Sequence, residues 1–144
     1  MNIEQINEFF DGKRQALIAE NAKALQEIKL PAALEHSWFY TPLMEAERME
    51  MQQLLDKPEI KDNDNIDAFK LEIVFRAKSK SGKREFEEEA EILLVVNKMK
   101  LWSVAEIHRM GNELGKIDKA SASLGTDNLK TGSDQTDTNS TSAP

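Results

Sequence analysis

Two histidines, His36 and His108, are the only side chains of a type that commonly exchanges protons near neutral pH. Beside a carboxylate such as Glu35, Glu45 or Glu106, an imidazole could act as a general acid or base. Nothing in the spacing links the two histidines, so we interpret them as a partly exposed helix residue and a strand-end residue. We therefore expect no catalytic residue and favour a protein that is not an enzyme.

Motifs for other chemistry are absent. The chain has no cysteine, which excludes disulfides, thiolate ligands and a cysteine nucleophile. The histidines lack the spacing of a zinc site. No glycine-rich phosphate loop and no nucleophile elbow occurs. We expect neither a metal nor a cofactor.

The charge balance narrows the class of partner. The formal net charge is −7, from 26 acidic and 19 basic residues. Such a chain is repelled by nucleic-acid phosphates and by anionic membranes, whereas a basic protein is attracted. No stretch reaches the roughly 18–20 apolar residues of a membrane helix, and the first residues do not resemble a secretory signal. These features predict a cytoplasmic location.

Three consecutive aromatic residues, Trp38, Phe39 and Tyr40, are the first candidate contact site. No regular element can point all three inward, and Trp and Tyr dominate binding hot spots. We therefore predict that Trp38 and Tyr40 bind a partner; the alternative is a corner that plugs the open end of a sheet. The acidic run 85–91 is either a solvated strand face or a docking surface for a basic partner.

Helical signals occupy the first part of the chain. Asn2 and Gln5 have the spacing of a capping box at the start of a helix over 2–29. Its apolar residues recur at helical steps and predict one buried face: Ile3, Ile6, Phe10, Leu17, Ala24 and Ile28. Thr41 and Pro42 predict the start of a second helix over 42–56.

Alternation of apolar and polar residues then predicts strands over 68–77 and 86–96, with a third over 101–110. Pairing Phe69 with Val96 places Lys78 opposite Glu87 and Arg76 opposite Glu89, which is favourable across strands. The alternative is a helix over 84–97, since Glu, Ala and Leu are strong helix formers.

The outer face of this predicted sheet carries an apolar spot. Val74, Leu93 and Val95 lie on the otherwise charged side, and such spots mark protein contacts. We therefore expect partner binding, or pairing of two copies, through these residues.

The fold class that follows is α+β, with N-terminal helices packed on a curved antiparallel meander of three or more strands. The globular domain is predicted to cover 1–112. Residues 113–144 are polar and are predicted to be a disordered tail, because they carry too little apolar mass to offset the entropy of ordering.

The order of elements resembles the NTF2-like (cystatin-like α+β) superfamily. The turn Asn97-Lys98-Met99-Lys100 before a strand containing Trp102 is similar to the closing hairpin of that family. The resemblance covers about residues 1–110 and implies a cone-shaped sheet with a pocket. Family members use the pocket for isomerase or dehydratase chemistry, for small ligands or for nothing, and many are dimerising or adaptor modules. The apolar inward positions favour a non-catalytic member.

The function predicted from the sequence is a non-enzymatic protein-interaction or adaptor module, self-associating as a homodimer through the outer sheet face. One alternative is a pocket protein for a small apolar ligand, or an acid–base enzyme of NTF2-like type. Another is an acidic inhibitor of a basic protein.

Overall fold

The computed structural model describes residues 1–129 of the 144-residue chain. Within them the fold is α+β, with six helices and one two-stranded antiparallel sheet. Two short 3-10 turns lie at Ala32–Leu34 and Met99–Leu101. In chain order the elements are α1 (Ile3–Ala22), β1 (Gln26–Lys29), β2 (Ser37–Tyr40), α2 (Glu45–Leu55), α3 (Pro58–Lys61), α4 (Ala68–Arg76), α5 (Glu89–Lys98) and α6 (Val104–Leu129).

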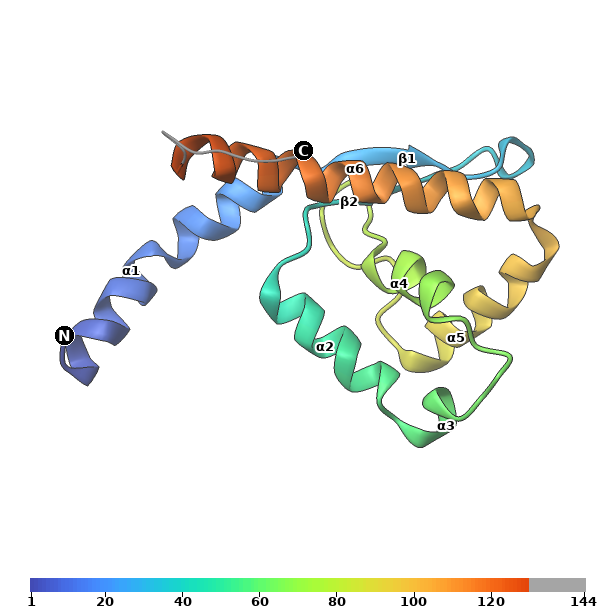
Figure 1. The fold of residues 1–144 in the computed structure, drawn as a ribbon, viewed down its shortest axis with the longest axis horizontal. Coiled ribbons are helices and arrows are strands. Elements are labelled where there is room, and N and C mark those ends of the chain that lie inside the picture. Colours follow the sequence, from blue (N-terminus) through green and yellow to red (C-terminus); the bar gives the residue numbers. More distant parts are fainter. Residues whose placement is uncertain (130–144) are drawn as a thin grey trace, which may run out of the picture.

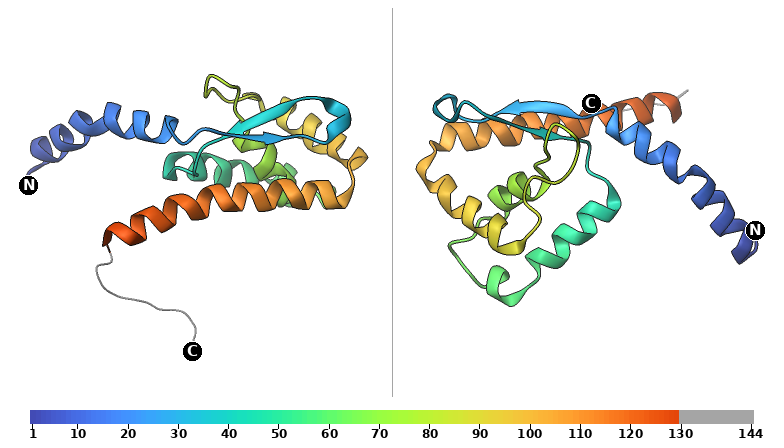
Figure 2. Two further views of the ribbon diagram at one scale, coloured as in Figure 1. Left: turned by 90° about the horizontal axis from the view of Figure 1, so that it is seen from above. Right: turned by 180° about the vertical axis from the view of Figure 1, so that it is seen from behind.

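The body of the molecule surrounds α4. The β1–β2 hairpin and α6 run side by side along one side of it, and α2, α3 and α5 close the other side (Figures 1 and 2). In the hairpin, Gln26 lies opposite Tyr40 and Lys29 opposite Ser37. Helix α1 projects away from this body (Figure 1).

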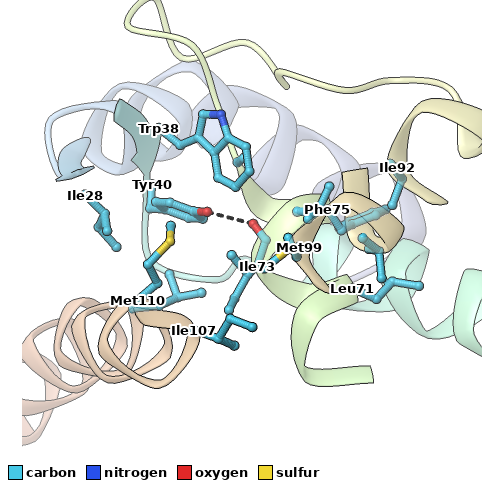
Figure 3. Close-up of a cluster of buried hydrophobic side chains, with 14 of the residues drawn as sticks. Ile28, Trp38, Tyr40, Leu71, Ile73, Phe75, Ile92, Met99, Ile107 and Met110 are labelled. Carbon is cyan, nitrogen blue, oxygen red and sulfur yellow. Dashed lines mark hydrogen bonds between the residues drawn. The ribbon is translucent and has the colours of Figure 1, made fainter. Parts of the chain in front are cut away.

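The core lies between the hairpin, α4, α5 and α6 (Figure 3). Its centre holds Tyr40, whose hydroxyl donates a hydrogen bond to the Ile73 carbonyl at 2.7 Å. Trp38 packs edge-on against Phe86, with ring centroids 5.5 Å apart. Through Tyr40, the hairpin is thus attached to α4.

The predicted antiparallel meander is wrong, because residues 68–76 and 89–98 form α4 and α5 and the sheet in the described residues has only two strands. Asp67 caps α4 by accepting a hydrogen bond from the Phe69 N–H. Elements pack against α4 on several sides, so Leu71, Ile73 and Val74 are all buried. A helix buried on most sides loses the 3.6-residue pattern, and its apolar residues were interpreted as a strand.

The start of α5 explains the acidic run. The Glu91 carboxylate accepts the N–H groups of Glu87 and Glu88, which closes the first turn, and negative charge is favourable at a helix N-terminus. Glu89 pairs with Lys57 rather than with Arg76. The alternative prediction of a helix over 84–97 is therefore the correct one, with its start at Glu89.

The predicted third strand over 101–110 is also wrong, because α6 begins at Val104. The Ser103 hydroxyl accepts a hydrogen bond from the Glu106 N–H at 3.2 Å, the capping contact that Ser-x-x-Glu sequences encode. Helix α6 continues past the predicted domain boundary at 112, with Leu114 and Ile117 buried in the core. Residues 130–144 of the predicted tail lie outside the described residues.

Arg76 connects three parts of the fold. Its side chain is fully buried, and it donates to Asp118 of α6 at 2.8 and 2.9 Å, to Glu72 at 2.9 Å and to the Thr41 carbonyl at 3.1 Å. Burial lowers the pKa of the guanidinium, but Asp118 and Glu72 outweigh that effect and leave the pKa raised.

The predicted helix over 42–56 is confirmed as α2, although it starts at Glu45 and Thr41 is buried before it.

Removing the Asp118 carboxylate should destabilise the fold more than removing the buried charge itself. Asp118→Ala leaves the Arg76 guanidinium buried without its main partner and should cost about 2 kcal/mol, less than for a fully buried pair. Arg76→Met removes the charge and should cost less. Urea unfolding of both variants measures this, with Lys119→Ala as the control. Equal stability of Asp118→Ala and the control would contradict the role of the ion pair.

Tyr40 should make the protein less stable in alkali. Burial raises the pKa of the Tyr40 hydroxyl far above its ordinary 10.0, and the nearby Arg76 charge only partly offsets this. The folded state therefore holds the phenol proton that the unfolded state releases, so the contribution of Tyr40 to stability is constant below about pH 10 and falls above it. Because the chain has one tyrosine, tyrosinate absorbance should appear only together with loss of the fold. Tyrosinate absorbance at its ordinary pH in the folded protein would refute this.

Candidate protein-interaction site

The aromatic residues predicted to bind a partner lie in the core. Trp38 and Tyr40 are 5 % and 0 % exposed, because both occupy the inward side of β2. Phe39 lies on the other side of the strand, where it is half-buried and lines an open groove. The prediction that the three rings cannot all point inward holds, but the contact assignment to Trp38 and Tyr40 is corrected.

The predicted apolar contact face is not formed. Val74 is fully buried inside α4, and Leu93 and Val95 are half-buried in α5, where they pack against the core. The three residues were assigned to the outer face of one sheet, and the helices turn them toward the interior. None of them forms the exposed spot expected from the strand pattern.

The histidines are not arranged for acid–base chemistry. The His108 ring packs edge-on against Phe69, with centroids 6.2 Å apart. Within the described residues neither histidine makes a hydrogen bond or ion pair with a carboxylate. Hydrogen bonds from arginines lower the pKa values of two carboxylates that could have paired with a histidine, Glu45 and Glu106. No three metal-ligating side chains cluster in this part of the chain.

Helix α1 carries the exposed apolar surface that the sequence reasoning assigned to the core. Every residue from Met1 to Glu20 is exposed. Four large apolar side chains lie on the same face of the helix, and we call them the α1 row. Their exposed fractions are 79 % for Ile3, 41 % for Ile6, 59 % for Phe10 and 48 % for Leu17. For these four residues the predicted burial is wrong, because the body of this chain does not cover them; Ile28 of the same predicted face is buried, but in β1.

Local sequence explains why α1 is nevertheless helical. The predicted capping box is confirmed, since the Asn2 side chain accepts the Gln5 N–H at 2.8 Å and Gln5 accepts the Asn2 N–H at 2.9 Å. The helix ends at Ala22 instead of continuing to 29, because residues 26–29 pair with β2. No helix among residues 1–129 is both long and apolar enough to cross a membrane.

Comparisons of the chain with protein-family models, curated proteins and solved structures find no match. They neither support nor refute the resemblance to the NTF2-like superfamily. The residues that carried it, 97–107, form the end of α5, a 3-10 turn and the start of α6.

Gly12 gives a direct test of the independence of α1. A Cβ atom at this position would meet no atom within 4 Å, and alanine favours a helix interior over glycine by about 1 kcal/mol. Gly12→Ala should therefore increase the protection of α1 amides in hydrogen exchange and leave the unfolding midpoint of the body unchanged. A shift of that midpoint would show that α1 packs on the body.

Proposed function

We propose that this protein is a non-enzymatic protein-interaction module that self-associates through α1. The single observation that carries the proposal is the exposure of the α1 row. Contiguous apolar patches are uncommon on the solvent-exposed surface of a protein, and they mark sites of protein contact. The self-association expected from the sequence is retained, but its interface moves from a sheet face to a helix.

The stability of α1 supports the need for a partner. Most of the stability of a helix in a protein comes from packing of its apolar face rather than from intrinsic propensity, the 20 residues of α1 lack such packing, and Gly12 lowers the helical preference further. The capping box contributes only about 1 kcal/mol. Full burial of one large apolar side chain contributes about 1.5–3 kcal/mol, so covering the four residues of the row outweighs these deficits.

The spacing of the row favours another helix as the covering element. Ile3, Ile6, Phe10 and Leu17 follow steps of three, four and seven, the pattern by which two helices pack along a seam. A second copy supplies an identical row, so a two-fold axis can bury both rows in one contact. A homodimer is therefore the simplest assembly that removes this surface from water.

The acidic residues Glu4 and Glu8 and the polar Gln15 lie on the side of α1 opposite the row, because residues on one side recur at steps of three and four. Arg14 lies on the side of the row, three residues before Leu17, so the seam carries one cation from each copy between Phe10 and Leu17. The carboxylates of two copies therefore need not meet across the row, despite the net charge of −7 on each chain.

A change of oligomeric state tests the proposal. Size-exclusion chromatography with light scattering should show that the full chain is a dimer or larger. Replacing Phe10 and Leu17 together by Glu should give a monomer, because charge in the seam is desolvated without a partner. Helicity and the unfolding midpoint of the body report that the variant remains folded.

The matched control is Gln15→Glu, which adds charge to the same helix on the side away from the row. It should assemble as the wild type does. A wild-type monomer at micromolar and millimolar concentrations, or a double Phe10 and Leu17 variant that still assembles, would refute self-association through α1.

A further inference from the structure

A second cluster of exposed apolar side chains lies where α4 and α6 begin. Phe69, Leu101 and Val104 are all exposed, although each is large and apolar. Phe69 and Val104, together with the half-buried Trp102, line an open groove with a volume of about 540 Å³, which we call the α4–α6 groove. It is separate from the α1 row, and the proposed self-association does not use it.

The floor of the α4–α6 groove belongs to the core. Met99 and Ile107 line the groove and are buried, so a side chain that enters it meets the apolar interior directly. Binding clefts commonly measure roughly 300–1,000 Å³ and combine apolar and aromatic walls with a few polar groups. The groove has this size and this composition.

Gly111 of α6 allows Phe69 to form one wall of the groove. A Cβ atom at position 111 would overlap the Phe69 ring, because it would lie 2.9 Å from both Cε atoms. The ring therefore lies directly on the backbone of α6. The His108 ring, one turn earlier in α6, packs edge-on against the same ring. Phe69 is thus held in place from two positions of α6 while part of its surface stays exposed.

The charges of the groove that have no partner are positive. Lys70 and Lys100 line it, and neither forms an ion pair or a hydrogen bond within residues 1–129. The acidic residue of the lining, Asp67, is already engaged, since its carboxylate accepts the Phe69 N–H at 3.0 Å and caps α4. Two cations therefore face one carboxylate that is used within the fold.

This local excess of positive charge is opposite in sign to the net charge of −7 on the chain. Charges at the surface that are farther away than the Debye length, about 8 Å at physiological ionic strength, are largely screened. A ligand in the groove therefore responds mainly to Lys70 and Lys100. Carboxylates next to an apolar group complement these two lysines, whereas ammonium groups do not.

The surroundings of the groove also select the backbone conformation of a protein ligand. Its lining comes from α4, the 3-10 turn Met99–Leu101, α6 and the residues directly before the two helices. No strand lines it within the described residues, so it offers no ladder of backbone partners. A peptide on such a surface satisfies its own N–H and C=O groups when it is a helix.

We propose that the α4–α6 groove binds an amphipathic helix of a partner protein, whose apolar face is flanked by carboxylates. Large apolar side chains of that helix pack against Phe69 and Trp102, and its carboxylates pair with Lys70 and Lys100. This is the helix-in-groove mode of recognition. The groove gives the protein a second contact that does not depend on α1.

The probe is a labelled peptide of about 15 residues, long enough to form a helix, with leucines at steps of three and four and glutamates beside them. Fluorescence anisotropy measures its binding to the full chain in which Phe10 and Leu17 are both replaced by Glu, because this variant removes the α1 row as a competing apolar surface. Binding should saturate and should shift the NMR signal of the Trp102 indole N–H. A peptide with lysine in place of glutamate should bind about tenfold more weakly.

Two pairs of substitutions test the walls of the groove. Val104→Glu places a carboxylate in the groove and should weaken binding about tenfold, while negative charge in the first turn of α6 favours the helix. Ala105→Glu, which adds the same charge at the next position outside the groove, is its control. Gly111→Ala should displace the Phe69 ring and weaken binding, whereas Gly115→Ala, where a Cβ meets no atom within 4 Å, should not.

Replacing Lys70 and Lys100 together by Gln tests the charge complementarity. The preference for the glutamate peptide over the lysine peptide should be lost in this variant, because the charges that distinguish the two peptides are gone. Lys98→Gln, outside the groove, should keep the preference.

Three outcomes overturn the proposal: no saturable binding of the glutamate peptide, equal binding by Val104→Glu and Ala105→Glu, or equal binding of the glutamate and lysine peptides. Weaker binding by the wild type than by the double Phe10 and Leu17 variant also overturns it, because α1 of a second copy then occupies the groove. The oligomeric state is measured without peptide, so failure of this proposal and failure of the self-association through α1 are distinguishable.

Discussion

The buried guanidinium of Arg76 is the constraint on which the arrangement of the helices depends. A charge taken out of water needs an opposite charge beside it. Glu72 on the same helix and Asp118, 42 residues further along the chain, supply that charge and bond the two terminal nitrogens of the guanidinium, whereas its buried Nε has no hydrogen-bond partner in the described part of the chain. The pair therefore holds α6 against α4 and carries the folded region past residue 112.

The same residue fixes the path of the chain between the hairpin and α2. Arg76 donates to the Thr41 carbonyl, directly after the strand whose Tyr40 hydroxyl bonds to the Ile73 carbonyl. Two hydrogen bonds from opposite directions thus join β2 to one turn of α4. With the hairpin and α6 held in this way, the buried core is formed by residues between Ile28 and Ile117.

The core is complete without α1, so this helix packs against no apolar surface of its own chain. Its row of large side chains then remains in water, which is the physical basis for a contact with another molecule.

Local signals in the sequence determined several features correctly. The side chains of Asn2 and Gln5 specify the start of α1 because capping involves neighbours in the chain, and a helix near 42–56 follows from its residues. Ser103 and Glu106 carried an equally local capping signal that the strand prediction overlooked. For residues 68–76 only the tertiary structure decided between helix and strand, because a helix buried on most sides loses its periodicity. It also decided that the α1 row is exposed. An apolar stripe in a sequence shows that a face needs cover, but only the packing of the whole chain shows whether that cover comes from the same molecule.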